Sequence, residues 1–211
     1  LAVTCYPLQT SADATNLVGY WKFDEGTGTT AADSSSYANN GTLAGSGVTY
    51  SNVQVAPITA SNPYSLHFDG STGTGVVVPD SNSLDMSNSL TAMAWIYWDG
   101  YSGDDNVVFD KSNAPNGDIP NYRLILKGDG RLALWNGSLA GYSSGTTVHA
   151  NEWTLVNFTI NSGVTSFFIN GVPAGTANIG VGATTNYNLY IGRDAKGRYF
   201  HGYIDEARLY N

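Results

Sequence analysis

Apolar and polar residues alternate with a period of two in short segments along most of the chain, and this pattern constrains the fold more than any other feature. In the first segment, Leu17, Trp21 and Phe23 fall on one face of an extended chain, whereas Tyr20 and Asp24 fall on the other. A period of two is typical of β-strands. Helical spacing is confined to a single possible turn near residues 81–86.

Further segments of this kind follow at regular intervals, each ended by turn residues. Two hairpins are predicted, one around Gly128-Asp129-Gly130 and one around Asn170-Gly171, because these sequences favour tight turns. The segment 90–98 is apolar on both faces, so we place it at the centre of a sheet. The predicted strands are 17–24, 64–68, 75–78, 90–98, 106–110, 122–127, 131–135, 153–160, 165–169, 188–192 and 199–210.

These strands predict an all-β protein: a two-sheet antiparallel β-sandwich of the jelly-roll type. The pattern excludes doubly wound α/β folds and helical bundles. Residues 1–16 have no periodicity and are expected to form an N-terminal arm or linker, and residues 17–211 a single domain. Residues 31–52 are rich in Ser, Asn, Gly and Ala and are expected to form a long loop.

The charge composition excludes two classes of partner. Only 9 Lys and Arg face 17 Asp and Glu, without a basic run, so nucleic acid is not an expected partner. No apolar stretch is long enough to insert into a membrane. Cys5, the single cysteine, is expected to be a free or intermolecularly paired thiol rather than a lipid-attachment site. Because the chain starts at Leu1 and is poor in charge, we expect a processed piece of a larger secreted or surface protein.

Oxygen-bearing side chains gather in two segments near the start of the domain and one at its end. Asp33, Asn39 and the carbonyl of Gly41 belong to one loop, and Asp24 and Asp205 come from strands at the two chain ends. Carboxylate, amide and carbonyl oxygens are the ligands that Ca²⁺ prefers. The alternative is that Asp24 and Asp33 cap turns and that Asp205 pairs with an arginine. We also expect a bulge at Asp205-Glu206, because the apolar register slips there.

Aromatic and amide side chains in the middle of the chain form a second group. Sugars stack on aromatic faces while polar side chains bind their hydroxyl groups, so these residues are candidate ligand-binding positions. The alternative is that the tryptophans at strand ends belong to the edge of the core. The candidates are Trp98, Tyr101, Asn116, Trp135 and Tyr142.

Several motifs, in order along the chain, resemble a known family. The run from Val18 to Gly28, then Asp33-Ser34-Ser35 and Asn40-Gly41-Thr42-Leu43, resembles the opening of laminin-G-like jelly-roll modules of the concanavalin A-like lectin/glucanase superfamily. Later segments are similar to the remaining landmarks of that family: 66–70, 90–96, Trp153, 168–171, 189–192 and 202–211.

The resemblance implies a β-sandwich and, in many members, a structural calcium ion near the paired termini. Carried over to this chain, the calcium ligands would be Asp24, Asp33, Asn39, Gly41 and Asp205. Ser36-Tyr37-Ala38 departs from the family, because Gly-rich spacing is usual there.

The function expected from these observations is recognition rather than catalysis. Glu25, Glu152 and Glu206 are the only glutamates, and none lies two or four residues from another, as the strand-borne acids of glucanases do. Glycoside hydrolysis is therefore the less favoured prediction. We expect a calcium-stabilised, extracellular module that binds a glycan or a surface glycoprotein. The alternative is a domain displayed on a pilus, fibre or adhesin without a small ligand.

Overall fold

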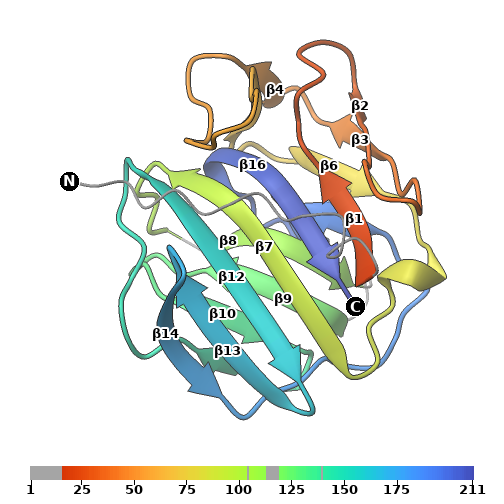
Figure 1. Ribbon diagram of the computed structural model, residues 1–211, viewed down its shortest axis with the longest axis vertical. Helices are drawn as coiled ribbons and strands as arrows, with labels where there is room; N and C mark the ends of the chain where they lie inside the picture. The colour runs from red at the N-terminus through yellow and green to blue at the C-terminus, as the bar shows by residue number, and fades with distance from the viewer. Residues whose placement is uncertain (1–15, 104, 113–118, 139) are drawn as a thin grey trace.

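The computed structural model describes residues 16–103, 105–112, 119–138 and 140–211, and it confirms a two-sheet antiparallel β-sandwich (Figure 1). The first sheet has the order β14-β13-β12-β7-β16-β5-β4, and β1 also pairs with β16. It consists of β1 (Leu17–Trp21), β4 (Val48–Ser51), β5 (Ser65–Asp69), β7 (Ser89–Trp98), β12 (Trp153–Asn161), β13 (Val164–Ile169), β14 (Val172–Ala177) and β16 (His201–Tyr210).

The second sheet lies behind the first in Figure 1 and has the order β11-β10-β9-β8-β15-β6-β3-β2. It consists of β2 (Thr30–Ala31), β3 (Gly41–Ala44), β6 (Gly75–Val78), β8 (Asn106–Ser112), β9 (Pro120–Leu126), β10 (Leu132–Trp135), β11 (Ala140–Tyr142) and β15 (Leu189–Ile191). A 3-10 turn, η2 (Asn82–Leu84), stands where the sequence predicted one helical turn.

The core fills the space between the sheets, because each strand directs alternate side chains inward. In β7, every second residue from Leu90 to Trp98 is buried, and the strand lies between β12 and β16, as its apolar sequence predicts. Trp21, Phe68 and Phe158 are among the large side chains that are fully buried in this core.

Both predicted hairpins are present. Asn170 and Gly171 have φ angles of 50° and 75°, the left-handed conformation that a tight two-residue turn requires. The turn before β10 is closed by a hydrogen bond from the Gly130 amide to the Lys127 carbonyl. It brings Lys127 and Asp129 to one end of the second sheet.

The predicted bulge in β16 is also present, and the strand pairs with a different neighbour on each side of the bulge. The pairing of β16 with β7 shifts between Asp205 and Arg208, and Glu206 has a φ of 52°. Before the bulge, β16 pairs with β5, and after it with β1. The first and last strands of the domain therefore lie side by side.

The prediction of one long loop at 31–52 was wrong. This segment holds the end of β2 and all of β3 and β4, which add edge strands to both sheets. The strands are two to four residues long, too short for their alternation to stand out in a Ser- and Gly-rich sequence.

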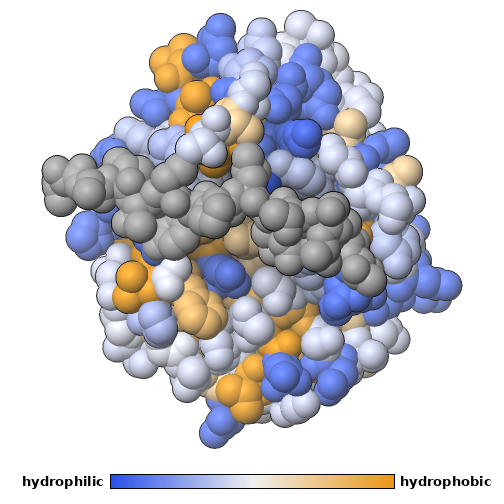
Figure 2. Space-filling view, in the orientation of Figure 1, coloured by the Kyte–Doolittle hydropathy of each residue, from blue (hydrophilic) through white to orange (hydrophobic). Residues whose placement is uncertain are grey.

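The outer face of the first sheet is mixed in character. Figure 2 shows mostly hydrophilic and weakly polar residues on the visible part of this face, with hydrophobic residues in separate patches. Within the described ranges, no helix is long and apolar enough to cross a membrane. The predicted arm, 1–16, and Cys5 with it lie outside the described residues, apart from Asn16.

Candidate functional site

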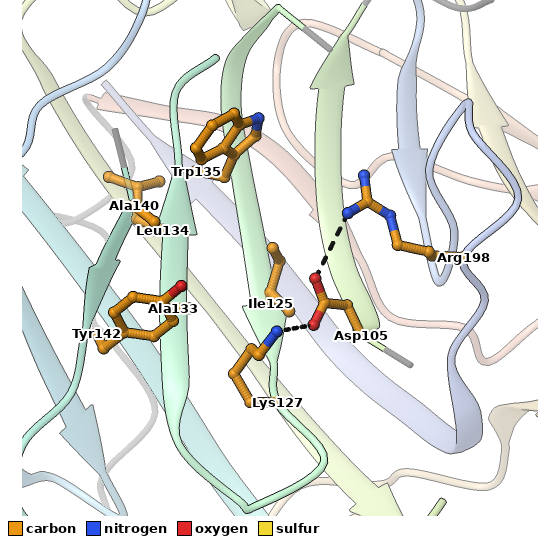
Figure 3. A pocket seen from close by; sticks show the side chains of 9 residues that line it. All are labelled: Asp105, Ile125, Lys127, Ala133, Leu134, Trp135, Ala140, Tyr142 and Arg198. Carbon is orange, nitrogen blue, oxygen red and sulfur yellow. Dashed lines mark hydrogen bonds and ion pairs between the residues drawn. The ribbon is translucent and has the colours of Figure 1, made fainter. Parts of the chain in front are cut away.

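A hollow of about 240 Å³ opens on the outer face of the second sheet, over β9, β10 and β11 (Figure 3). Two of the five predicted ligand-binding residues, Trp135 and Tyr142, line it. The other lining residues are Asp105, Ile125, Lys127, Ala133, Leu134, Ala140 and Arg198.

Small side chains make the hollow. Ala133 lies between Ile125 of β9 and Tyr142 of β11, and Ala140 lies opposite Trp135. Residues that face each other across neighbouring strands have Cβ atoms about 5 Å apart, so an alanine between larger side chains leaves a depression. The two aromatic rings therefore stand on either side of a floor formed by Ala133 and Ile125.

Charged side chains form the wall opposite the rings. Asp105 precedes β8, and its carboxylate accepts a hydrogen bond from the Lys127 ammonium group and lies 3.5 Å from the Arg198 guanidinium group. The Lys127 side chain is 31% exposed, so solvent and a ligand can reach it. Figure 3 shows Lys127 and Arg198 converging on Asp105 from two sides.

A buried chain of charges fixes Arg198. Its Nε donates to Asp194 at 2.5 Å, and Asp194 also lies 3.6 Å from Nε of Arg123, which donates to Asp110 at 2.9 Å. Arg123, Asp110 and Asp194 are fully buried. Burial raises the pKa of Asp110, while the charge of Arg123 opposes the rise. Breaking one contact of this network would leave a buried charge unpaired, which is strongly destabilising. The network therefore holds Arg198 in one position.

Arg131, which does not line the hollow, packs its guanidinium group over the Tyr142 ring. The Arg131 guanidinium group lies 5.1 Å from the centre of the Tyr142 ring and is itself bonded to Asp129 at 2.8 Å. Tyr142 is nevertheless 41% exposed, so much of its ring surface is accessible. The arrangement can bind a ligand that offers both a flat apolar face and hydroxyl groups.

The three remaining predicted ligand-binding residues lie elsewhere. Trp98 is 6% exposed and belongs to the core, as the alternative interpretation expected, and its indole NH donates to the Tyr101 carbonyl. The Tyr101 ring stacks on His201 with centroids 3.8 Å apart. Asn116 lies outside the described residues.

Asp33, one of the predicted calcium ligands, accepts hydrogen bonds from protein groups at both carboxylate oxygens. Its Oδ1 accepts the amides of Tyr20 and Ser35 at 2.7 and 2.8 Å. Its Oδ2 accepts the Asn39 amide at 2.7 Å and the Ser35 hydroxyl at 2.6 Å. The Asn39 side-chain amide donates to the Val18 carbonyl. Asp33 thus organises its loop, as the turn-capping alternative expected.

The other predicted ligands are spread over different environments. Gly41 is paired with Ala31 within the second sheet. Asp24 accepts a weak hydrogen bond from the Tyr64 amide, at 3.4 Å. Asp205 accepts hydrogen bonds from the amides of Ala56 and Asn62, not from an arginine as the alternative proposed. In the described part of the chain, no three Asp, Glu, His or Cys side chains lie together in one group.

Sequence reasoning placed Asp105 in a candidate binding loop but did not connect it with Lys127 and Arg198, the two cations of the hollow. Asp105, Lys127 and Arg198 are far apart in the chain and meet only because the 193–199 loop folds over β8 and β9. Asp105 and Lys127 stand at the ends of predicted strands, a position that suits a binding residue but does not reveal its partner. No sequence pattern indicated Arg198.

Solved structures with the same fold come from several kinds of protein. Domain 4 of AbnA, an extracellular arabinanase from Geobacillus stearothermophilus solved with arabinotriose, is 21% identical, with a TM-score of 0.69, 93% coverage of this chain and 92% of that chain. The binding domain of Paraclostridial Mosquitocidal Protein 1 is 17% identical, with a TM-score of 0.67. Trypanosoma rangeli sialidase is 17% identical, with a TM-score of 0.65.

The extent of these similarities differs. The toxin domain is matched over 93% of this chain and 49% of its own length, and the sialidase over 100% of this chain and 33% of its own length. No curated protein sequence matches the chain.

Family membership follows from the sequence match. Residues 69–211, more than half of the chain, match the laminin G-type family model described as the concanavalin A-like lectin/glucanases superfamily. This region contains every residue that lines the hollow. The chain therefore belongs to the concanavalin A-like lectin/glucanases superfamily.

Proposed function

We propose that this chain is a non-catalytic carbohydrate-binding domain and that the hollow between Trp135, Tyr142 and Arg198 holds a sugar unit. The observation that carries the proposal is the combination of two aromatic rings with a fixed group of charged hydrogen-bonding side chains around one open depression. Binding sites for small polar ligands combine an apolar surface with a few polar groups in this way.

The two sides of the hollow suit the two sides of a sugar. Trp135 and Tyr142 offer ring faces against which the CH groups of a pyranose or furanose can pack. Asp105 accepts hydrogen bonds from hydroxyl groups, and Lys127 and Arg198 donate to them. Hydrogen bonds to charged groups are about twice as strong as those between neutral groups, so this wall supplies orientation as well as affinity.

Similar structures support the same class of ligand. The AbnA domain was solved with arabinotriose, and the Paraclostridial toxin domain with this fold is named a binding domain. An extracellular setting for this chain, suggested by its composition and by the extracellular arabinanase, is part of the proposal.

The hollow suits binding better than hydrolysis. Hydrolysis of glycosidic bonds generally uses two carboxyl groups about 5 to 9.5 Å apart. Among the described residues that line the hollow, Asp105 is the only acid, and two cations bind it. None of the predicted calcium ligands lines the hollow, so the proposed sugar contacts do not involve them.

A glycan array followed by isothermal titration calorimetry tests the proposal. The array should include neutral and acidic glycans, with arabino-oligosaccharides among them, and be run in calcium and in EDTA. The variants Trp135→Ala and Tyr142→Ala should weaken binding at least tenfold. Tyr37→Ala is the matched control, because Tyr37 is 49% exposed and lies outside the lining of the hollow.

Three results would contradict the proposal. A blank array with a folded sample would favour a domain made only for display. Equal binding by the wild type and both ring variants would place the site elsewhere. Release of reducing sugar from a bound polysaccharide would show that the domain is a hydrolase.

A further inference from the structure

A second hollow of about 490 Å³ adjoins the first and shares two of its residues. It is lined by Ser102, Gly103, Asp105, Lys127, Gly128 and Asp129. Asp105 and Lys127 also line the first hollow, so their ion pair stands between the two. Both are open depressions rather than enclosed cavities. We call the two adjoining hollows the trough; its lining extends from Trp135, past Asp105 and Lys127, to Asp129.

The far part of the trough is built by two loops in close contact. A Cβ atom on Gly128 would lie 2.7 Å from the Cα of Ser102, so the loops approach too closely for a side chain at this position. A Cβ on Gly103 would lie 2.6 Å from the Tyr101 hydroxyl oxygen. The Lys127 amide also donates to the Arg131 carbonyl, which fixes the turn. A preformed trough lowers the cost of ordering on binding.

The charges along the trough are paired with one another. Lys127 and Arg198 both contact Asp105, Arg198 also contacts Asp194, and Arg131 contacts Asp129. An anionic sugar would have to compete with these carboxylates for the cations, in a chain of net charge −8. An uncharged sugar can bond to both signs of charge without breaking a pair.

On the basis of the proposed function, we infer that the trough binds an internal segment of an uncharged polysaccharide, with successive sugar units on either side of the Asp105–Lys127 pair. A site for a chain end would need one hollow, whereas this surface has two that share Asp105 and Lys127. Affinity therefore increases with the length of the ligand until both hollows are filled.

Titration calorimetry with oligosaccharides of one to six sugar units, prepared as a ladder of lengths from arabinan, xylan and β-glucan, tests this inference. Polygalacturonic acid is the acidic probe. For a ladder that binds, affinity should increase at least tenfold between two and four units. Ser102→Trp places a ring in the second hollow and should abolish this increase. Asp129→Ala should reduce it. Ser36→Trp, an exposed serine outside both hollows, is the matched control and should bind as the wild type does.

Each outcome is decisive. Equal affinities for two and six units, unchanged by Ser102→Trp, would overturn the trough and leave sugar binding in the first hollow intact. Tighter binding of polygalacturonic acid than of any neutral ladder would overturn the uncharged ligand class. Failure of every ladder and of the acidic polymer would overturn the proposed function together with this inference.

Discussion

Replacing Asp33 by alanine should destabilise the fold strongly, because one buried carboxylate organises the loop between β2 and β3. Asp33 is 8% exposed and accepts four hydrogen bonds, three from main-chain amides and one from a hydroxyl group. The Tyr20 amide ties the loop to β1, and the Asn39 amide closes the loop on itself.

The magnitude follows from the donors that would lose their acceptor. A hydrogen bond to a charged group contributes about 1.5–3 kcal/mol, and an unsatisfied buried donor costs about 1–3 kcal/mol. Two of the donors, the amides of Tyr20 and Asn39, lie in buried or partly buried surroundings. We therefore expect Asp33→Ala to lower the free energy of unfolding by about 3–5 kcal/mol, or Tm by roughly 6–20 °C in a domain of this size. Ser35→Ala, which removes only the hydroxyl donor, should cost about 1 kcal/mol.

Urea unfolding followed by tryptophan fluorescence measures both effects, and it should be run in excess calcium and in EDTA. The hydrogen bonds predict the same loss of stability in both solutions. A loss below about 1 kcal/mol would show that the carboxylate does not organise the loop. A wild type that EDTA destabilises, together with an Asp33→Ala variant that EDTA leaves unchanged, would restore Asp33 as a calcium ligand.

Two further predictions concern stability. Burial raises the pKa of Asp205 from 3.8 to about 7, so the folded state binds the carboxyl proton more tightly than the unfolded state does. The free energy of unfolding should therefore fall by roughly 4 kcal/mol as pH rises from about 4 to about 7. Urea unfolding across this range should show a flatter profile for Asp205→Asn, and an equally steep one would assign the effect to other groups. Gly192→Ala should cost about 2–5 kcal/mol, because the added Cβ would lie 2.2 Å from the Phe68 ring at a φ of 77°. Gly28→Ala, at a φ of 81° with no atom within 4 Å, should cost only about 1–2 kcal/mol, and equal losses in thermal unfolding would show that the Phe68 ring adapts.

The sheets could be predicted from sequence because strand alternation and turn chemistry act locally. The Asn170-Gly171 turn and the bulge at Glu206 are visible in sequence, since each leaves a mark on two or three neighbouring residues. The strands β3 and β4 were missed because each is only four residues long, and pairing with β6 and β5 is needed to hold them in the sheets.

The candidate site was only half predictable, for a different reason. Trp135 and Tyr142 could be found because aromatic residues near turns are unusual enough to attract notice. Arg198 lies 93 residues from Asp105 along the chain, and only the folded arrangement of the 193–199 loop brings them together. Asp33 and Asp205 were assigned to calcium through the family resemblance, and the fold shows which amide groups bind their carboxylates.

Indole NMR signals give the most direct test of the proposed binding site. The chain has five tryptophans, and Trp135→Phe identifies the Nε1–H resonance of Trp135 by its loss. We expect arabinotriose, or the tightest neutral ligand found on the array, to shift this resonance while that of Trp21, buried and bonded to the Asn39 carbonyl, stays in place. Saturable shifts confined to Trp95 or Trp153, whose side chains lie on the first sheet, would contradict the account.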